Sequence, residues 1–262
     1  LEDFLGQHEV SSREIMQGQK LRQKLLNSRL SKYNVGEKGK LDFREKADGR
    51  PVILVPGQVE GDASLKYGSP DIYTNASLVK AAYDKAANDH QDGAYIVYKP
   101  HPDVVSGNRE GAVPQKLLDI CVDEVITDAD IIDCLDAVDS VHTMTSLTGF
   151  EALLRGMSVT TYGMPFYAGW GLTRDICNEE RFLQARGRRV ELDGLVYALL
   201  IVYARYIDWE MRGKTSSAEA LATIIEKEAQ DKKNTKIAQQ GILALIGRQS
   251  RKIKYLLEGI RG

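Results

Sequence analysis

The sequence of 262 residues has little of what marks secreted, membrane-spanning or nucleic-acid-binding proteins. Its three cysteines, Cys121, Cys134 and Cys177, form no CxxC pair, which argues against a zinc or disulfide framework and fits a reducing cytoplasm. No stretch approaches the roughly 20 apolar residues of a membrane-spanning helix, and the acidic N-terminal residues lack the layout of a secretion signal. A formal net charge of −2 argues against a general nucleic-acid surface. We therefore predict a cytoplasmic protein that binds no nucleic acid.

Several common catalytic signatures are also missing. There is no P-loop GxxxxGK[ST] and no GxGxxG after a predicted strand, so ATPase and nicotinamide-dependent chemistries lose their usual phosphate-binding elements. No GxSxG nucleophile elbow is present. The residues Asp128-Ala129-Asp130 spell the DxD of metal-dependent sugar transferases. They precede a predicted short helix, which favours helix-capping carboxylates over a metal site.

What the sequence does contain is a regular alternation of short strands and helices. Apolar runs rich in β-branched residues predict strands at 52–55, 94–98, 124–127, 140–142 and 158–162. Helical spacing between them predicts helices at 76–87, 115–121, 130–135 and 147–155. Strands and helices that take turns in this way predict an α/β fold with a parallel sheet and right-handed crossovers.

Outside this alternating region the sequence predicts helices. The capping box Ser11-Ser12-Arg13-Glu14 begins a helix that ends near residues 31–34, and a polar, glycine-punctuated linker follows at 36–49. Beyond the last strand we predict only helices, at 196–206, 216–228 and 235–257.

Small, polar and cationic residues collect directly after the predicted strands. They occupy 57–64 after the first strand, 99–103 after the second, 143–146 after the fourth and 163–171 after the fifth. The amino ends of the same strands have nothing comparable. Because the carboxyl ends of parallel strands share one edge of the sheet, we expect these segments to form a single ligand site.

The residue types in these segments suit a phosphorylated ligand. Thr145 and Ser146 stand where a helix begins, and they can either hold a phosphate or simply cap the helix. Lys99 and His101 supply positive charge, and His101 lies between two prolines that aim it rigidly. Glu151 can accept hydrogen bonds from both hydroxyls of a ribose, or it can be an ordinary surface residue.

Asp62 lies between a glycine and small residues in a loop expected to face the same site. A carboxylate placed there can act as a nucleophile, as a base or as a turn former. Its spacing from the other candidates does not choose among these roles.

Four segments together resemble one known family. They are 57–64 (GQVEGDAS), 98–103 (YKPHPD), 145–153 (TSLTGFEAL) and 163–173 (GMPFYAGWGLT), in that order. They resemble the capsule polysaccharide biosynthesis family, and within it the retaining β-Kdo transferases, especially the C-terminal module of their dual-module members. The resemblance implies a Rossmann-like parallel sheet of the GT-B donor-domain type, with additional C-terminal helices.

The resemblance also implies an activity. Such enzymes take Kdo, an acidic eight-carbon ketose, from CMP-Kdo and add it to a lipid-linked Kdo oligosaccharide, the linker of capsular polysaccharide. They retain the β configuration by double displacement and use no metal or other cofactor. The phosphate and the Kdo carboxylate are both negative, so Lys99, His101 and a helix N-terminus are suitable neighbours for this donor.

Site residues follow from the matching positions. The resemblance implies that Asp62 is the nucleophile, and we predict Gln58 as a second catalytic residue. The predicted donor-binding residues are Gly57, Lys99, His101, Pro102, Thr145, Ser146, Glu151, Tyr167 and Trp170.

Modules of this family have a further N-terminal Rossmann-like half that helps to bind the acceptor, and we expect most of it to be missing from this sequence. We accordingly predict a helical remnant and linker at 1–48, a nucleotide-sugar-binding domain at 49–210 and C-terminal helices at 211–262. The basic, amphipathic segment 241–262 suits either the inner-membrane surface, near the capsule assembly machinery, or packing against the domain. The alternative functions are another CMP-sugar transferase or nucleotide-sugar enzyme, and an inactive nucleotide-binding module.

Overall fold

The computed structural model describes residues 1–27, 41–177, 179–204, 207–208, 214–215 and 217. The chain divides into two units, Leu1–Ala204 and Arg205–Gly262. In the second unit, the short strands β7 (Ile207–Asp208) and β8 (Lys214–Thr215) form an antiparallel pair that the sequence did not predict. The helices predicted at 216–228 and 235–257, and the basic segment 241–262, lie outside the described residues.

A six-stranded parallel sheet in the first unit confirms the predicted Rossmann-like fold. Its strands are β1 (Val52–Pro56), β2 (Tyr95–Lys99), β3 (Glu124–Val125), β4 (Ser140–Thr143), β5 (Ser158–Thr161) and β6 (Arg174–Asp175). Their order is β3-β2-β1-β4-β5-β6, so the strand order reverses between β1 and β4. In an open parallel sheet, the crevice beyond the carboxyl ends of the strands at such a reversal is the usual ligand site.

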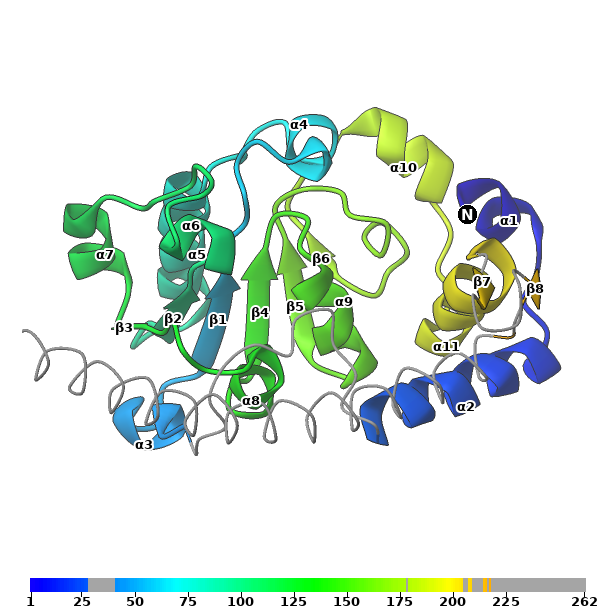
Figure 1. Cartoon of the computed structure of the whole chain (residues 1–262), viewed down its shortest axis with the longest axis horizontal. Coiled ribbons are helices and arrows are strands. Elements are labelled where there is room, and N and C mark those ends of the chain that lie inside the picture. The colour runs from blue at the N-terminus through cyan, green and yellow to red at the C-terminus, as the bar shows by residue number, and fades with distance from the viewer. Residues whose placement is uncertain (28–40, 178, 205–206, 209–213, 216, 218–262) are drawn as a thin grey trace, which may run out of the picture. The chain divides into compact units, whose positions relative to one another are not determined.

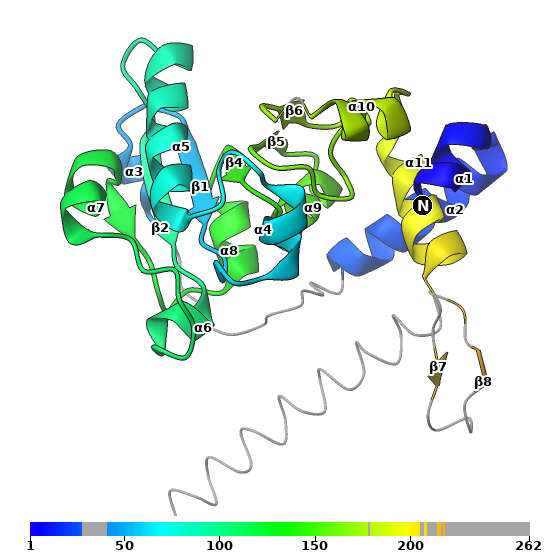
Figure 2. The same ribbon diagram turned by 90° about the horizontal axis from the view of Figure 1, so that it is seen from above.

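Helices cover both faces of the sheet, with α5 on one side and α8 and α9 on the other (Figures 1 and 2). The helices that follow the first four strands are α4 (Ala63–Gly68), α5 (Asn75–Asp89), α6 (Pro102–Val105), α7 (Gln115–Cys121), α8 (Ile131–Asp136) and α9 (Leu147–Leu154), and α10 (Glu180–Arg186) follows β6. Every residue of β1 and β2 is buried, which explains why both strands appear in the sequence as continuous apolar runs. Ala82 and Ala86 of α5 pack in the core against side chains of these strands.

The predicted linker at 36–49 contains a short helix, α3 (Phe43–Lys46), within its described part. The side chain of Phe43 is completely buried, and Arg44 forms an ion pair with Asp139, which directly precedes β4. Residues 43–46 therefore pack on the domain rather than form an open linker, because Phe43 provides an apolar anchor.

The N-terminal helices α1 (Glu2–Gln7) and α2 (Ser12–Asn27) belong to the same unit. The Glu14 half of the predicted capping box is present, since the backbone N–H and hydroxyl of Ser11 both donate to the Glu14 carboxylate, each at 2.8 Å. Helix α2 packs on α11 (Leu192–Val196), where Gly18 leaves room for the carbonyl of Asp193 and Arg22 pairs with the Asp193 carboxylate.

The helix predicted at 196–206 begins earlier and changes type, because α11 continues into a π-helix, η1 (Tyr197–Tyr203). Among the described residues, no helix is both long and apolar enough to cross a membrane.

Candidate functional site

A cavity of about 820 Å³ opens at the carboxyl ends of β1, β2 and β4. All the predicted site residues except Tyr167 and Trp170 line it: Gly57, Gln58, Asp62, Lys99, His101, Pro102, Thr145, Ser146 and Glu151. The segments after these three strands therefore meet as the sequence predicts. The sequence prediction did not assign Ser64 and Asp128 to the site, although both also line the cavity.

Asp62 is the N-cap of α4, and its Oδ1 accepts a hydrogen bond from the backbone N–H of Ser64 at 3.0 Å. The residue is exposed and lines the cavity. Its second carboxylate oxygen makes no hydrogen bond to any residue that the structure describes. The side chain therefore serves as a helix cap and still presents one oxygen for other chemistry.

Gln58 ties the loop after β1 to the loop after β4. Its side-chain amide donates to Thr145 Oγ1 at 3.0 Å, and its Oε1 accepts from the backbone N–H of Thr145 at 3.0 Å. The backbone N–H and carbonyl of Gln58 both pair with the side chain of Asn75, at 2.8 and 2.7 Å. Because both ends of the amide are engaged, the geometry favours a positioning role for Gln58, and its catalytic role stays a prediction.

Ser146 is the N-cap of α9, with Oγ accepting from the backbone N–H of Thr148 at 3.2 Å. Ser146, Leu147 and Thr148 all line the cavity, so the positive end of the α9 dipole lies there. Glu151, on the next turn of α9, also lines the cavity and is buried rather than an ordinary surface residue.

Lys99 provides a positive charge at the wall of the cavity. Only 8% of the residue is exposed, and among the described residues its Nζ donates a single long hydrogen bond, at 3.4 Å, to the carbonyl of Thr127. Burial lowers the pKa of Lys99, while the nearby carboxylates of Asp130 and Asp128 oppose this shift. A buried ammonium with so little hydrogen bonding is suited to pairing with an anionic ligand.

His101 caps α6, and its Nδ1 accepts a hydrogen bond from the backbone N–H of Asp103 at 3.2 Å. A ring nitrogen that accepts a hydrogen bond has no proton of its own, so the neutral ring has its proton on Nε2. In this tautomer the ring N–H is on Nε2, and an N–H is the kind of group that donates to an oxygen of an anionic ligand.

Of the two aspartates of the DxD sequence, Asp130 caps a helix, as predicted. Asp130 is buried and accepts a hydrogen bond from the backbone N–H of Ile132 at 2.8 Å, at the start of α8. Asp128 lines the cavity instead. Within the described part of the chain, no group of three or more His, Cys, Asp or Glu residues is arranged to hold a metal ion.

Tyr167 and Trp170 do not line the cavity, which corrects the prediction that they contact the donor. Both residues are 0% exposed. The Tyr167 hydroxyl donates to the carbonyl of Ser146 at 2.6 Å, and Trp170 Nε1 donates to the carbonyl of Phe166 at 2.9 Å. Their aromatic rings supply packing for the loop after β5, because large apolar surfaces gain more from burial than from exposure at a polar site.

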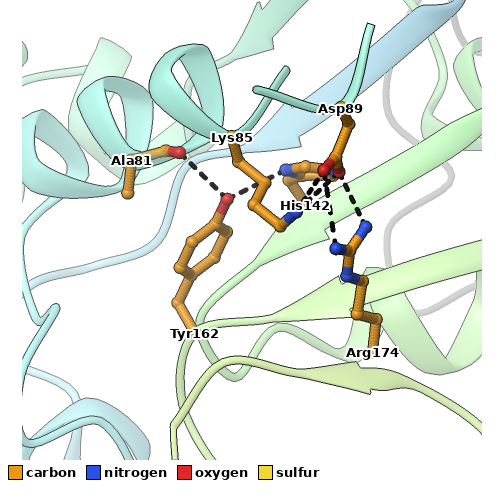
Figure 3. Close-up of polar contacts among 6 residues, drawn as sticks. All are labelled: Ala81, Lys85, Asp89, His142, Tyr162 and Arg174. Atoms are coloured by element: carbon orange, nitrogen blue, oxygen red, sulfur yellow. Dashed lines mark hydrogen bonds and ion pairs between the residues drawn. The ribbon is translucent and has the colours of Figure 1, made fainter. Parts of the chain in front are cut away.

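A second polar cluster joins residues of α5 to residues of β4 and β6 and of the loop after β5 (Figure 3). His142 of β4 is buried, and its Nδ1 lies 3.0 Å from the hydroxyl of Tyr162, which donates to the carbonyl of Ala81 at 3.1 Å. Burial lowers the pKa of His142 to about 4. Asp89 nearby pairs with Lys85 at 2.5 Å and with Arg174 at 2.7 Å. We call these residues, His142, Tyr162, Lys85, Asp89 and Arg174, the His142 cluster; none of them lines the cavity.

Relatives of known sequence match the chain over all or much of its length. The capsule polysaccharide modification protein LipA of Neisseria meningitidis serogroup B is 42% identical over 261 residues, which is 100% of this chain and 35% of LipA. The lipopolysaccharide-processing protein LpsZ of Rhizobium meliloti is 43% identical over 178 residues, which is 68% of this chain and 38% of LpsZ. The chain thus spans little more than a third of the length of these relatives.

Two solved structures of KpsC from Thermosulfurimonas dismutans share the fold. The beta Kdo 2,7 transferase is 35% identical with a TM-score of 0.67, covering 87% of this chain and 65% of that one. The beta Kdo 2,4 transferase is 30% identical with a TM-score of 0.68, covering 86% and 67%. Residues 2–206 also match the family described as capsule polysaccharide biosynthesis protein. The sheet, the loops at its carboxyl edge and this match over most of the described chain agree, and the chain belongs to the capsule polysaccharide biosynthesis protein family.

Proposed function

We propose that this chain is a glycosyltransferase that binds CMP-Kdo in the cavity and transfers Kdo with retention of the β configuration. The similarity to KpsC, whose solved structures are Kdo transferases, supports the reaction class. The match to LipA and to the capsule polysaccharide family supports a product that belongs to capsular polysaccharide.

One observation supports this proposal above the others: a carboxylate and several anion-binding groups share one cavity. Asp62 lines the same space as Lys99, His101 and the N-terminus of α9. CMP-Kdo has a phosphate and a carboxylate close to its anomeric carbon, so a site for it needs positive groups near a nucleophile. The cavity supplies both.

The proposed reaction has two displacements at the anomeric carbon of Kdo. A carboxylate oxygen of Asp62 forms a bond to that carbon while the bond to the phosphate oxygen breaks, and CMP leaves with the electron pair. A hydroxyl of the acceptor then attacks the same carbon, gives its proton to solvent and displaces Asp62 as a carboxylate. Two inversions restore the β configuration. Lys99, His101 and the end of α9 stabilise the charge on departing CMP, and no metal or other cofactor takes part in these steps.

The proposed acceptor is a lipid-linked Kdo oligosaccharide. An acceptor of this kind is anchored in the inner membrane, so we propose that the protein works in the cytoplasm at that membrane surface, together with the capsule assembly machinery. Exposed Val105 and Leu147 line the cavity and offer apolar surface for the hydrocarbon faces of bound sugar.

The decisive experiment compares donors and then removes the nucleophile. Purified chain is incubated with CMP-Kdo or CMP-sialate and a Kdo oligosaccharide acceptor, and products are analysed by mass spectrometry. We expect transfer from CMP-Kdo; turnover of only CMP-sialate would refute the proposed donor. Binding of CMP by calorimetry without transfer from either donor would favour an inactive nucleotide-binding module.

The variant Asp62→Asn tests the nucleophile with little disturbance of the fold, because asparagine caps helices about as well as aspartate. We expect transfer to fall by about 1,000-fold or more, as for removal of a covalent nucleophile, while CMP affinity is kept. Asp71→Asn is the matched control, since Asp71 is an exposed aspartate that does not line the cavity. An Asp62→Asn protein with normal transfer would rule out the double displacement through this residue.

A further inference from the structure

The loop at 163–171, which follows β5, contacts the two helices that present the proposed nucleophile and the proposed phosphate site. We propose that this loop is a rigid spacer that sets the position of Ser146 relative to Asp62, with Tyr167 as its positioning residue. The inference rests on the proposed function, because it concerns the geometry of the same cavity.

The first contact is with α9. The hydroxyl of Tyr167 donates to the carbonyl of Ser146 at 2.6 Å, and the Tyr167 side chain is fully buried. The approach requires a glycine on α9, because a Cβ at position 149 would overlap the Tyr167 hydroxyl. Ser146 is the N-cap of α9, so this hydrogen bond holds the end of the helix that lines the cavity.

The second contact is with α4. The backbone N–H of Met164 donates to the carbonyl of Gly68 at 2.7 Å, at the C-terminal end of α4. Gly163 packs so closely that an added Cβ would lie 2.6 Å from the same carbonyl oxygen. Helix α4 has six residues and begins at its cap Asp62, so a shift at Gly68 moves the proposed nucleophile with it.

The loop itself is held from outside the cavity. Arg186 of α10 donates to the carbonyls of Pro165 at 2.6 Å and Ala168 at 3.2 Å, and it forms an ion pair with Glu2 of α1 at 2.5 Å. A buried guanidinium bonded to several carbonyls restricts the backbone of the loop. The spacer is therefore anchored to the fold and does not rely on the ligand for its shape.

The consequence concerns the reacting atoms. Ser146 lies at the proposed phosphate site and Asp62 attacks the carbon attached to that phosphate. The separation of the two helix ends therefore decides whether the carboxylate is in line with the bond that breaks. Misplacement by about 1 Å commonly costs about 100-fold in rate. Because the loop touches both helices, different substitutions in it have separable effects.

The first test removes the hydrogen bond from Tyr167 to the carbonyl of Ser146. Tyr167→Phe loses one hydroxyl and keeps the ring, and Tyr162→Phe is the matched control because its buried hydroxyl also donates to a backbone carbonyl, that of Ala81, away from the cavity. We expect Tyr167→Phe to raise the dissociation constant for CMP about ten-fold, the size expected for one buried hydrogen bond. Tyr162→Phe should leave that constant unchanged, although both variants melt at a lower temperature.

The second test disturbs the packing of the loop against Gly68, at the end of α4. Gly163→Ala forces a shift against Gly68, and Gly6→Ala is its control because nothing lies within 4 Å of a Cβ there. With CMP-Kdo at saturating concentration, we expect Gly163→Ala to slow the cleavage of CMP from the donor about 100-fold. The affinity for CMP itself should be retained. Gly6→Ala should cleave CMP from CMP-Kdo at the rate of the unmodified chain.

Hydrogen exchange supplies a measurement that needs no ligand. Tyr167→Phe should speed exchange at Thr148 and Gly149, whose N–H groups bond to Ser146, and Tyr162→Phe should not. Equal CMP affinity and equal exchange in the two tyrosine variants would overturn the inference alone. Failure of the unmodified chain to bind CMP would refute the proposed function and the inference with it.

Discussion

The cavity and the His142 cluster both collect charged side chains, but they use the charges differently. In the His142 cluster, Asp89 pairs with Lys85 and Arg174, and the Tyr162 hydroxyl bonds to both His142 and Ala81. In the cavity, Lys99 has a single long hydrogen bond within the described part of the chain, to a neutral carbonyl. Charges that are paired internally contribute to the fold, whereas a buried charge without a strong partner is held at a cost that a ligand can offset.

The two buried tyrosines after β5 show the same difference. Tyr162 and Tyr167 both have a pKa that burial raises, and each hydroxyl donates to a backbone carbonyl. Tyr162 reaches the middle of α5, while Tyr167 reaches the cap of α9 at the cavity. Similar chemistry therefore has a different consequence according to which helix receives the hydrogen bond.

The largest effect that we expect in this comparison is the response of the His142 cluster to acid. The pKa of His142 is lowered to about 4, so the unfolded chain binds a proton on this residue at higher pH than the folded chain does. Its contribution to the free energy of unfolding is present above about pH 6.5 and is lost as the pH falls toward 4, by about 3 kcal/mol in total. Lys85, Arg174 and His90 oppose protonation, and Asp89 favours it.

Urea unfolding between pH 7 and 4 measures this response, with His142→Gln as the comparison. We expect the variant to be less stable at pH 7 and to lose less stability on acidification than the unmodified chain. Parallel curves for the two proteins would show that His142 is not the titrating group.

The next prediction contrasts two lysines. Lys99→Met removes the ammonium from the cavity, and we expect the dissociation constant for CMP to rise about 30-fold because a charge-assisted contact is lost. The variant should be at least as stable as the unmodified chain, since burial of the charge no longer costs free energy. Lys85→Met is the control, because it removes an ion-pair partner of Asp89 in the His142 cluster.

Calorimetry with CMP and thermal melts measure both quantities. Lys85→Met should lower the melting temperature and leave CMP affinity unchanged. If Lys85→Met weakened CMP binding as much as Lys99→Met, the contrast between the paired Lys85 and the cavity residue Lys99 would be wrong.

The smallest expected effect concerns His101. Replacement by alanine removes the Nε2 donor and the cap of α6, and we expect CMP to bind about five-fold more weakly, as for one neutral hydrogen bond. His90→Ala is the control, because His90 is exposed at the C-terminus of α5 and does not line the cavity. Unchanged CMP affinity in His101→Ala would remove this residue from the site.

The positions of the cavity residues could largely be predicted because they depend on strand order along the chain. Each parallel strand ends at the same edge, so the segments after β1, β2 and β4 must approach one another once the sheet forms. The strands themselves were evident because burial on both faces requires continuous apolar runs, as in β1 and β2. Strand β6 was missed because two residues, Arg174 and Asp175, show no such pattern.

The roles of individual side chains were harder to predict. Gln58 and Thr145 are 87 positions apart, and nothing near either residue in the sequence indicates their hydrogen bonds. Tyr167 and Trp170 lie in a segment that matches the family, yet the structure buries both. A local pattern indicates that a residue belongs to a loop at the site, but it does not show which way the side chain points.

The sequence by itself determined strands β1 to β5, the edge at which polar segments gather and the helix starts at Ser11 and Asp130, because these depend on neighbours within a few residues. The tertiary structure alone decided that Lys99 lines the cavity with a hydrogen bond only to a neutral carbonyl among the described residues, while Lys85 is paired with Asp89. It also decided that the Tyr167 hydroxyl donates a hydrogen bond to the carbonyl of Ser146. Burial and pairing across distant segments arise only when the whole chain packs, so no local pattern records them.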